Sequence, residues 1–402
     1  MSATPSDPRL FRRAIVLVLD SVGAGWLPDA ADFGDEGADT LGHIRDHVGL
    51  RMPNLSRLGL TRFLPGVDPD NGDTYAGASG RMGERSHGKD TITGHWEITG
   101  IVNEQPFPTY PNGFPEEVLK PFRERTGRDV IGNIPASGTE IIKDLGAEHM
   151  KTGAWIVYTS ADSVFQVAAH EEIVPVEELW KGCEIAREIL QGPHRVGRVI
   201  ARPFIGTPEE GFTRTSNRHD YAVPPPGRTL LDQLCDQRGR EDAVVGVGKI
   251  RDIYDGCGVP ISHRTKNNAD GIEKTVELIK AHGPESLLFV NLVDFDMLYG
   301  HRRNPEGYRD CLQDFDAALP RILEAMDDDD ALFITADHGN DPTWPGSDHT
   351  REYVPLIASG ASIKPVALGD TTCFADLGQT LADNFGLKLP EGRSLLSGLA
   401  GE

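Results

Sequence analysis

Three short apolar segments, each followed at once by an acidic residue, constrain the fold of this chain more than any other feature. They are residues 14–19 before Asp20, 287–293 before Asp294 and Asp296, and 331–336 before Asp337. Continuous apolar runs with β-branched residues are typical of parallel strands that are buried on both faces. Segments with helical periodicity, residues 268–282 and 304–326, lie between them. This alternation predicts an α/β fold, a mostly parallel sheet with helices on both faces.

Two proline-rich passages interrupt this pattern. The first contains Pro106, Pro108, Pro111 and Pro115, and the second is Pro224-Pro225-Pro226. Proline clusters of this kind suit connections between domains, and 402 residues are enough for two domains of about 100–200 residues each. We therefore expect residues 1–101 and 226–402 to form one metal-binding core domain, with residues 102–225 inserted as a smaller α/β cap. Strand candidates within the cap are residues 155–158 and 198–202.

Acids and histidines follow the expected strands in an order that suits a metal centre. The candidates are Asp20, Asp296, His301, Asp337, His338, Asp348 and His349. In open α/β sheets ligands bind beyond the carboxyl ends of the strands, so segments distant in sequence can converge there. Carboxylate and imidazole ligands without a nearby thiolate suit Mn²⁺ or Zn²⁺. The set predicts two divalent cations, a pair that can stabilise the attacking and leaving oxygens of a phosphoryl group.

A hydroxyl nucleophile is expected at Thr91, within the segment 89–97. The glycines before it, at positions 77, 80, 83 and 88, are expected to leave backbone N–H groups open to an anion. A helix that begins at this point would add the attraction of its N-terminal dipole. Metal coordination activates an alcohol by lowering its pKa. Two other interpretations stay open: Thr91 as a helix N-cap, and His95 with Glu97 as groups that orient the loop.

The overall charge argues against some classes of partner. Sixty-two acidic and 40 basic side chains give a net charge of −22, which disfavours nonspecific binding to nucleic acid or anionic membranes. No stretch approaches the roughly 20 apolar residues of a membrane span, and the run at 14–19 is too short for a signal peptide. Five widely spaced cysteines without a CxxC pair indicate reduced and mostly buried thiols, and hence a cytoplasmic protein. The acidic run 327–330 is expected to be a solvated turn before a strand.

Seven segments resemble those of phosphopentomutases, a family of the alkaline phosphatase superfamily. They are residues 18–23, 38–43, 89–97, 158–166, 199–204, 296–301 and 335–340. The likeness covers nearly the whole chain. It implies an alkaline-phosphatase-like α/β core with an inserted α/β cap. It also implies interconversion of ribose 1-phosphate and ribose 5-phosphate, and of the 2-deoxyribose pair.

The resemblance also implies roles for particular residues. One Mn²⁺ would be held by Asp20, Asp337, His338 and the phosphorylated Thr91, and a second Mn²⁺ by Asp296, His301 and His349. Phosphothreonine would convert the sugar phosphate to a bisphosphate and then recover a phosphoryl group from it. Ribose 1,5-bisphosphate or glucose 1,6-bisphosphate would activate the resting enzyme. The contacts to this small-molecule phosphosugar would fall on Ser160, Asp162, Arg198, Ile200, Arg214 and Lys249.

Other functions are compatible with the same ligands. One is a metal-dependent phosphatase, and another is a cofactor-independent phosphoglycerate mutase, whose family has Ser where Thr91 stands and is usually longer. A protein of a different class would bind phosphosugars or metal without catalysis. The loss of a ligand or of the nucleophile would be the sequence signature of that last class, and neither loss is visible.

Overall fold

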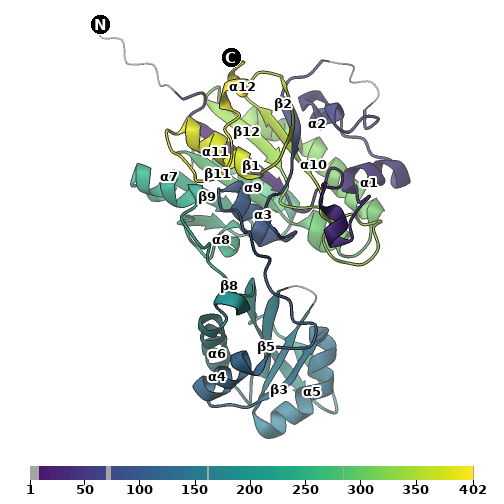
Figure 1. Ribbon diagram of the computed structural model, residues 1–402, viewed down its shortest axis with the longest axis vertical. Coiled ribbons are helices and arrows are strands. Elements are labelled where there is room, and N and C mark those ends of the chain that lie inside the picture. Colours follow the sequence, from purple (N-terminus) through teal and green to yellow (C-terminus); the bar gives the residue numbers. More distant parts are fainter. Residues whose placement is uncertain (1–8, 69–73, 161–162, 284, 402) are drawn as a thin grey trace. The chain divides into compact units, whose positions relative to one another are not determined.

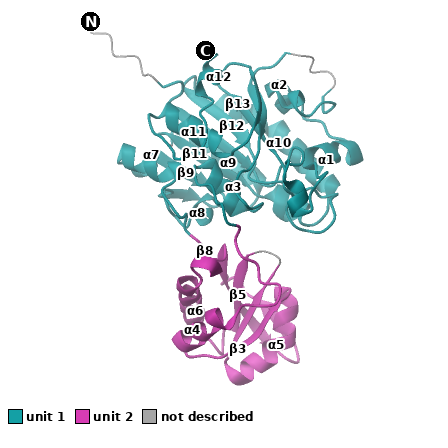
Figure 2. Ribbon diagram, viewed as in Figure 1, with its two compact units in different colours: residues 1–105, 224–402 teal, residues 106–223 magenta. Residues whose placement is uncertain are grey.

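The computed structural model describes residues 9–68, 74–160, 163–283 and 285–401. The chain divides into two compact units, which Figure 2 shows in different colours. Unit 1 consists of Met1–Gln105 with Pro224–Glu402, and unit 2 of Pro106–Val223. Both junctions lie at the proline-rich passages, and the domain borders expected from the sequence were 101/102 and 225/226.

An eight-stranded sheet runs through unit 1 in the order β10-β9-β11-β1-β12-β13-β2-β14 (Figure 1). Its strands are β1 (Arg13–Leu19), β2 (Ala78–Met82), β9 (Val244–Val247), β10 (Ile261–His263), β11 (Leu287–Leu292), β12 (Asp330–Thr335), β13 (Val354–Ser359) and β14 (Ala367–Thr371). Strand β13 pairs antiparallel with β12 and β2, and every other pairing is parallel. The expectation of a mostly parallel sheet is therefore confirmed.

The three apolar segments form adjacent strands at the centre of this sheet. Strand β1 lies between β11 and β12, and all residues of the three strands are buried. Leu19 pairs with Leu292, and Val18 pairs with Thr335. Because these strands are parallel and in register, the acids that follow them leave the sheet at the same edge.

Helices lie on both sides of this sheet (Figure 1). The α-helices of unit 1 are α1 (Thr40–Val48), α2 (Pro53–Leu58), α3 (Thr91–Ile98), α7 (Leu230–Arg238), α8 (Ile250–Ile253), α9 (Asn268–Lys280), α10 (Pro305–Ala325), α11 (Ala375–Asn384) and α12 (Leu396–Ala400). Helices α9 and α10 confirm the two expected helical segments, and each begins after an asparagine whose side chain accepts a backbone N–H of the first turn. Within the described ranges no helix is long and apolar enough to cross a membrane.

The acidic run at 327–330 is only partly the solvated turn that was expected. Residues 327–329 are exposed, but Asp330 is the first residue of β12 and is only 2% exposed. Its carboxylate accepts hydrogen bonds from Arg13 Nε at 2.8 Å and Nη2 at 2.5 Å. The expectation was wrong for Asp330 because a buried arginine on the neighbouring strand compensates its charge through two parallel hydrogen bonds.

The cysteines differ in part from the expectation. All five are free, but only Cys183 and Cys373 are buried, whereas Cys235, Cys257 and Cys311 are partly exposed. The prediction that most of the thiols are buried was therefore wrong.

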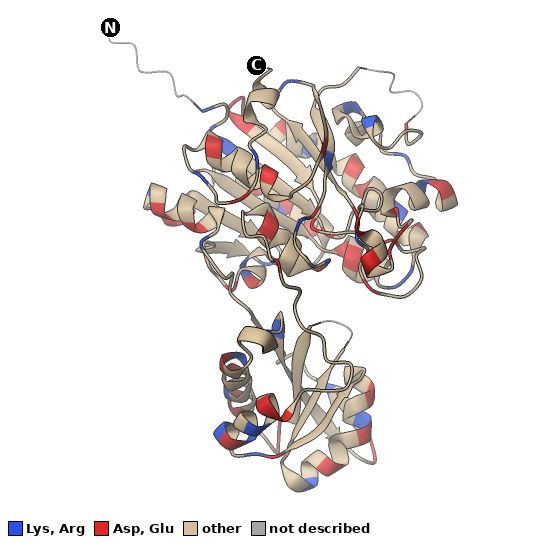
Figure 3. Cartoon of the chain, viewed as in Figure 1, with Lys and Arg blue, Asp and Glu red and all other residues tan. Residues whose placement is uncertain are grey.

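Unit 2 has a six-stranded mixed sheet in the order β3-β4-β5-β6-β7, with β8 also paired to β6. Its elements are β3 (Val130–Pro135), β4 (Trp155–Thr159), β5 (Val164–His170), β6 (Arg198–Thr207), β7 (Gly211–Arg214), β8 (His219–Ala222), α4 (Glu116–Thr126), α5 (Gly138–Thr152) and α6 (Val176–Ile189). Helices α4 and α6 pack in one hydrophobic cluster with Trp155 and Val199, and α5 packs in another with Tyr158 and Phe204. Unit 2 thus has an α/β core of its own, and in both units the charged residues lie mostly on helices and loops (Figure 3).

Candidate active site

The acids at the central strand ends meet a histidine and the expected nucleophile. Asp20 Oδ1 and Asp337 Oδ2 each lie 3.5 Å from His338 Nε2. Thr91 Oγ1 lies 3.3 Å from the same nitrogen. Asp20, Asp337 and His338 are each at most 1% exposed, and Thr91 is half-buried. These four side chains form the first ligand group.

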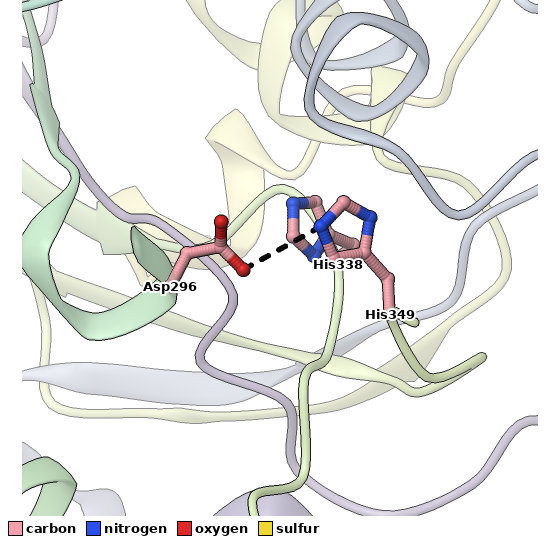
Figure 4. Close-up of side chains that lie close together, drawn as sticks. All are labelled: Asp296, His338 and His349. Atoms are coloured by element: carbon pink, nitrogen blue, oxygen red, sulfur yellow. Dashed lines mark ion pairs between the residues drawn. The ribbon is translucent and has the colours of Figure 1, made fainter. Parts of the chain in front are cut away.

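A second ligand group, Asp296, His301 and His349, adjoins the first. The Nε2 atoms of His301 and His349 lie 3.2 Å and 3.5 Å from the Asp296 carboxylate, and 3.2 Å from each other. Figure 4 shows Asp296, His338 and His349 close together, and their ligand atoms all lie within 4.8 Å of one another. Because His338 belongs to this cluster as well as to the first group, the two groups are neighbours. The structure thus brings together six of the seven candidate ligands, all except Asp348.

An irregular helix presents two of these side chains. Residues Phe295–Gly300 form a π-helix directly after β11, and the N–H of His301 donates to the carbonyl oxygen of Asp296 at 3.1 Å. This hydrogen bond joins residues five apart, so the wide turn places Asp296 and His301 on the same side of the chain. Such π-turns occur frequently at functional sites.

Amide groups orient the carboxylates. Asn291 Nδ2 donates to Asp20 Oδ2 at 2.8 Å, and Asn340 Nδ2 donates to Asp296 Oδ1 at 2.8 Å. The backbone N–H of Ser21 donates to Asp337 Oδ1 at 3.0 Å. In the first group this leaves one oxygen of each carboxylate turned toward His338. Sequence reasoning missed these amides, although Asn291 is the only polar residue within a buried apolar strand.

Backbone carbonyls fix the orientation of two histidines. His349 Nδ1 lies 2.8 Å from Lys89 O, and His301 Nδ1 lies 2.8 Å from Ser347 O. A carbonyl oxygen can only accept, so Nδ1 carries the hydrogen in each ring. The Nε2 atoms are then the ones that face Asp296 and could bind a cation, the arrangement usual for metal-binding histidines.

Four buried carboxylate oxygens in the described part of the chain accept no hydrogen bond, and two of them, Asp20 Oδ1 and Asp337 Oδ2, belong to the first ligand group. A buried charged oxygen without a partner costs considerable free energy. A cation between these oxygens and the Nε2 atom of His338 would remove that cost. The set of carboxylate oxygens and imidazole nitrogens therefore fits Mn²⁺ or Zn²⁺.

The groups also shift one another's pKa values. Burial alone would raise the pKa of Asp296, but His349 and the other histidines hold it well below its ordinary value. Asp337 behaves in the same way, with its pKa lowered mainly by His338 against the effect of burial. Burial lowers the pKa of His338, but Asp337 and Asp20 outweigh it and raise this pKa well above the ordinary value. The carboxylates are therefore ionised, and a bound cation would displace the proton of His338.

Helix α3 presents Thr91 at its first position. The N-cap is Asp90, whose carboxylate accepts the N–H groups of Ile92 and Thr93, both at 3.1 Å. The N-cap role that was open for Thr91 is thus taken by Asp90. The hydroxyl of Thr91 stands at the positive end of the helix dipole, where an anion is favoured.

Two of the four glycines before Thr91, Gly80 and Gly83, do not offer the open N–H groups that were expected. Gly80 is part of β2, and the N–H of Gly83 donates to Thr371 O at 2.8 Å. The N–H groups of Arg85 and Ser86 donate to the carboxylate of Glu97 at 2.9 Å and 2.6 Å. These donors are already used within the protein, so the expectation was wrong for Gly80 and Gly83.

Gly94 allows close packing between α3 and the end of β12. A Cβ atom at this position would lie 1.9 Å from the carbonyl oxygen of Asp337. Only a residue without a side chain lets the helix that carries Thr91 approach the Asp337 backbone this closely.

Other polar residues near the candidate site have structural partners. Asp348 is largely exposed and forms an ion pair with Lys89 Nζ at 3.2 Å, so it belongs to neither ligand group. Asp294 accepts the N–H of Asn268, the first residue of α9, at 2.7 Å. His95 Nδ1 lies 2.9 Å from Thr91 O and 3.1 Å from Asp337 Oδ2.

The residues expected to contact the sugar phosphate are distributed over both units. Ser160, Arg198, Ile200 and Arg214 belong to unit 2, Lys249 belongs to unit 1, and Asp162 lies outside the described residues. Lys249 is exposed at the N-cap of α8, whereas Ile200 is buried in β6.

One face of the unit 2 sheet carries a cluster of arginines. Arg198, Ile200, Arg202 and Phe204 are alternate residues of β6, so their side chains lie on the same face of the sheet. Arg214 of β7 pairs with Phe204 and therefore lies on that face too. Asp220 pairs with Ile200, lies 3.9 Å from Arg198 Nη1, and accepts two hydrogen bonds of 2.6 Å from Arg218. Arg202 and Arg218 were not among the residues expected to contact the sugar phosphate. We call Arg198, Arg202, Arg214 and Arg218 the arginine cluster.

An α/β sheet with carboxylates and histidines gathered at one edge fits a metalloenzyme, and the model of the Metalloenzyme superfamily matches residues 12–389. The phosphopentomutase of Carboxydothermus hydrogenoformans is 56% identical over 385 residues, 95% of this chain and 98% of that protein. The phosphopentomutase of Kosmotoga olearia is 57% identical over 381 residues, 94% of this chain and 96% of that protein. The solved structure of a phosphoglycerate mutase of Leishmania mexicana superposes over 98% of this chain and 98% of its own, at 13% identity and a TM-score of 0.48. The chain belongs to the phosphopentomutase family, which confirms the resemblance seen in the sequence.

Proposed function

We propose that this chain interconverts ribose 1-phosphate and ribose 5-phosphate, and the 2-deoxyribose pair, by passing a phosphoryl group through Thr91. The observation that supports this most directly is the Thr91 hydroxyl, which lies 3.3 Å from His338 Nε2 beside two adjoining ligand groups. The relatives at 56% and 57% identity are phosphopentomutases, and the match covers nearly their full length. The enzyme class that follows is an isomerase that transfers a phosphoryl group.

Two Mn²⁺ ions are the cofactors that we propose. One would be held by Asp20, Asp337, His338 and phosphorylated Thr91, and the other by Asp296, His301 and His349. When bound, the two cations supply positive charge to the oxygens of the phosphoryl group and lower the pKa of a bound hydroxyl. The orphaned oxygens of Asp20 and Asp337 support this assignment.

In the active form that we propose, Thr91 carries the phosphoryl group. A hydroxyl oxygen of the sugar phosphate forms a bond to phosphorus while the bond between phosphorus and Thr91 Oγ1 breaks, and the proton of that hydroxyl is balanced by the one that Thr91 Oγ1 gains. The product is a bisphosphorylated sugar. Its other phosphoryl group then passes to Thr91, which restores phosphothreonine and releases the isomer. A resting enzyme with a free Thr91 would first be phosphorylated by ribose 1,5-bisphosphate or glucose 1,6-bisphosphate.

Recognition of the sugar phosphate is assigned to the arginine cluster of unit 2 together with Ser160, Asp162, Ile200 and Lys249. The planar guanidinium of arginine presents two donors to a phosphate at once. Burial lowers the pKa of Arg202, and the neighbouring charge of Arg218 lowers it further. So many like charges on one face, with Asp220 between them, are expected where an anion binds.

The place of this reaction in the cell follows from the substrates. It would connect the pentose 1-phosphates produced by nucleoside phosphorolysis with the pentose 5-phosphates of central metabolism. Phosphorylated sugars are charged and do not diffuse across membranes, so we place the activity in the cytoplasm. The substrates are small molecules, and the net charge of −22 argues against a nucleic-acid partner.

The Thr91→Val variant tests the nucleophile, because it removes the hydroxyl and keeps the shape of the side chain. We expect loss of mutase activity, no phosphorylated protein in intact mass spectra after incubation with glucose 1,6-bisphosphate, and an unchanged metal content. Thr275→Val is the matched control, because Thr275 lies in α9 with its hydroxyl bonded to Gly271 O. Full turnover in Thr91→Val would refute the mechanism. Continuous release of phosphate by the wild type would instead indicate a phosphatase.

A further inference from the structure

Arg351 joins the segment after His349 to the loop before Thr91. Its side chain is only 2% exposed, and it donates hydrogen bonds to three loop carbonyls: Glu84 O at 2.9 Å, Ser86 O at 2.9 Å and Gly88 O at 2.6 Å. It also donates to the carboxylates of Glu84 at 2.8 Å and Asp29 at 2.9 Å. One guanidinium therefore binds alternate carbonyls along the loop that leads to the nucleophile.

Lys89 makes further connections between the same two segments. Its backbone carbonyl accepts the hydrogen bond from His349 Nδ1 at 2.8 Å. Its ammonium group lies 2.9 Å from Asp35 Oδ2, and that oxygen also accepts the backbone N–H of Arg351 at 2.9 Å. The position of His349 thus depends on a carbonyl only two residues before Thr91.

Glu97 holds the same loop through the loop's backbone N–H groups. It is fully buried, and it accepts the N–H groups of Arg85 and Ser86 and, at 2.9 Å, that of Phe374. Carbonyls of the loop are bound by Arg351, while its N–H groups are bound by a residue of α3 itself. The loop therefore has little freedom to move relative to α3 or to the segment of His349.

We propose that Arg351 is a positioning residue that holds Thr91 and His349 in the relative arrangement needed for phosphoryl transfer. This inference rests on the proposed function, because its test measures turnover of ribose 5-phosphate. Lysine keeps the positive charge but has a single compact ammonium group, so it cannot reproduce the planar set of hydrogen bonds. A displacement of about 1 Å at a reacting group costs roughly 100-fold in rate.

The test compares Arg351→Lys with Arg62→Lys. Arg62 is the matched control because it also donates to three backbone carbonyls, those of Gly77, Val366 and Pro365, but contacts none of the residues assigned to catalysis. We expect Arg351→Lys to lower kcat by about 100-fold and to leave KM for ribose 5-phosphate within about threefold. Phosphorylation of Thr91 by glucose 1,6-bisphosphate, followed by intact mass, should slow to a similar degree. Arg62→Lys should keep both rates within about twofold.

A second variant covers the case in which Arg351→Lys does not fold. Glu97→Gln replaces an acceptor of the loop N–H groups by an amide that cannot accept through both ends. Glu97→Gln should lower kcat by a larger factor than that by which it changes KM for ribose 5-phosphate. If the wild type shows no pentose phosphate turnover, the proposed function fails. If the wild type is active, and Arg351→Lys and Glu97→Gln both match Arg62→Lys in kcat, the proposed function stands but the positioning role of Arg351 is wrong.

Discussion

Replacement of Gly94 by alanine probes the contact between the helix of the nucleophile and the strand of the metal ligands. The added Cβ would lie 1.9 Å from Asp337 O, 2.7 Å from its carbonyl carbon and 3.0 Å from its Cα. Ordinary contact begins at 3.4 Å, so α3 must move away by about 1.5 Å (3.4 minus 1.9). The neighbouring atoms belong to backbone and cannot rotate aside as a side chain could.

This displacement moves Thr91 away from His338 and Asp337. We expect kcat for ribose 5-phosphate to fall by roughly 100-fold or more. The free energy of unfolding should fall by about 1–3 kcal/mol, the usual cost of an added methyl group in a packed core. Mutase kinetics and urea unfolding measure the two effects separately.

Two other glycines provide controls for this experiment. Gly398 lies in α12 with nothing within 4 Å of its added Cβ, so Gly398→Ala should leave kcat unchanged and should not destabilise the protein. A Cβ at Gly360 would lie 2.5 Å from Asp330 O, at the opposite end of β12. Gly360→Ala should therefore cost stability but leave kcat within about threefold. A folded Gly94→Ala variant with the kcat of the wild type would refute the reasoning.

Three further outcomes are expected. Burial raises the pKa of Glu352 to about 8, despite hydrogen bonds from threonines, so between pH 4.5 and about 8 the folded chain keeps a proton that the unfolded chain has lost. This group therefore makes the free energy of unfolding fall as pH rises through that window, by at most about 1.4 kcal/mol per pH unit. Glu352→Gln should remove this component when urea unfolding is measured at a series of pH values. Equal slopes of the free energy of unfolding against pH in both proteins would contradict it. Chelation should lower Tm because the buried carboxylates of the two ligand groups lose their cation. Mn²⁺ should restore Tm and, at 100 times its Kd, add about 2.7 kcal/mol to the free energy of unfolding. A Tm that does not respond to either would argue against the metal centre. Arg214→Ala should raise KM for ribose 5-phosphate about tenfold, since a charge-assisted hydrogen bond contributes about 1.5–3 kcal/mol. Arg321→Ala is the control and should leave KM unchanged, because it loses only a surface ion pair with Glu273. Equal KM values in the two variants would remove Arg214 from the substrate site.

The central strands could be predicted because their signal is local. A strand buried on both faces needs a continuous apolar run; Asp20 and Asp337 stand directly after such runs, and Asp296 stands three residues after the end of another. Parallel strands then bring these acids to one edge, so the convergence of most of the candidate ligands also followed from the sequence order. The particular π-turn that presents Asp296 and His301 has no comparable local pattern.

The groups that orient the site could not be predicted, because their partners are remote in sequence. Asn291 and Asp20 are 271 positions apart, and Arg351 and Glu84 are 267 positions apart. The same limit explains the wrong expectation for Asp330, whose charge is compensated by Arg13 on a neighbouring strand. The glycines before Thr91 misled for a different reason: composition shows that an N–H group lacks a bulky neighbour, but not that another carbonyl or carboxylate already binds it.

A phosphorus NMR time course tests the central claim most directly. The protein is incubated with Mn²⁺, ribose 5-phosphate and a catalytic amount of glucose 1,6-bisphosphate. We expect a growing resonance of a phosphate at the C1 position of the sugar, with little inorganic phosphate. Inorganic phosphate as the only product, or no change in a protein shown to contain its metal, would contradict it.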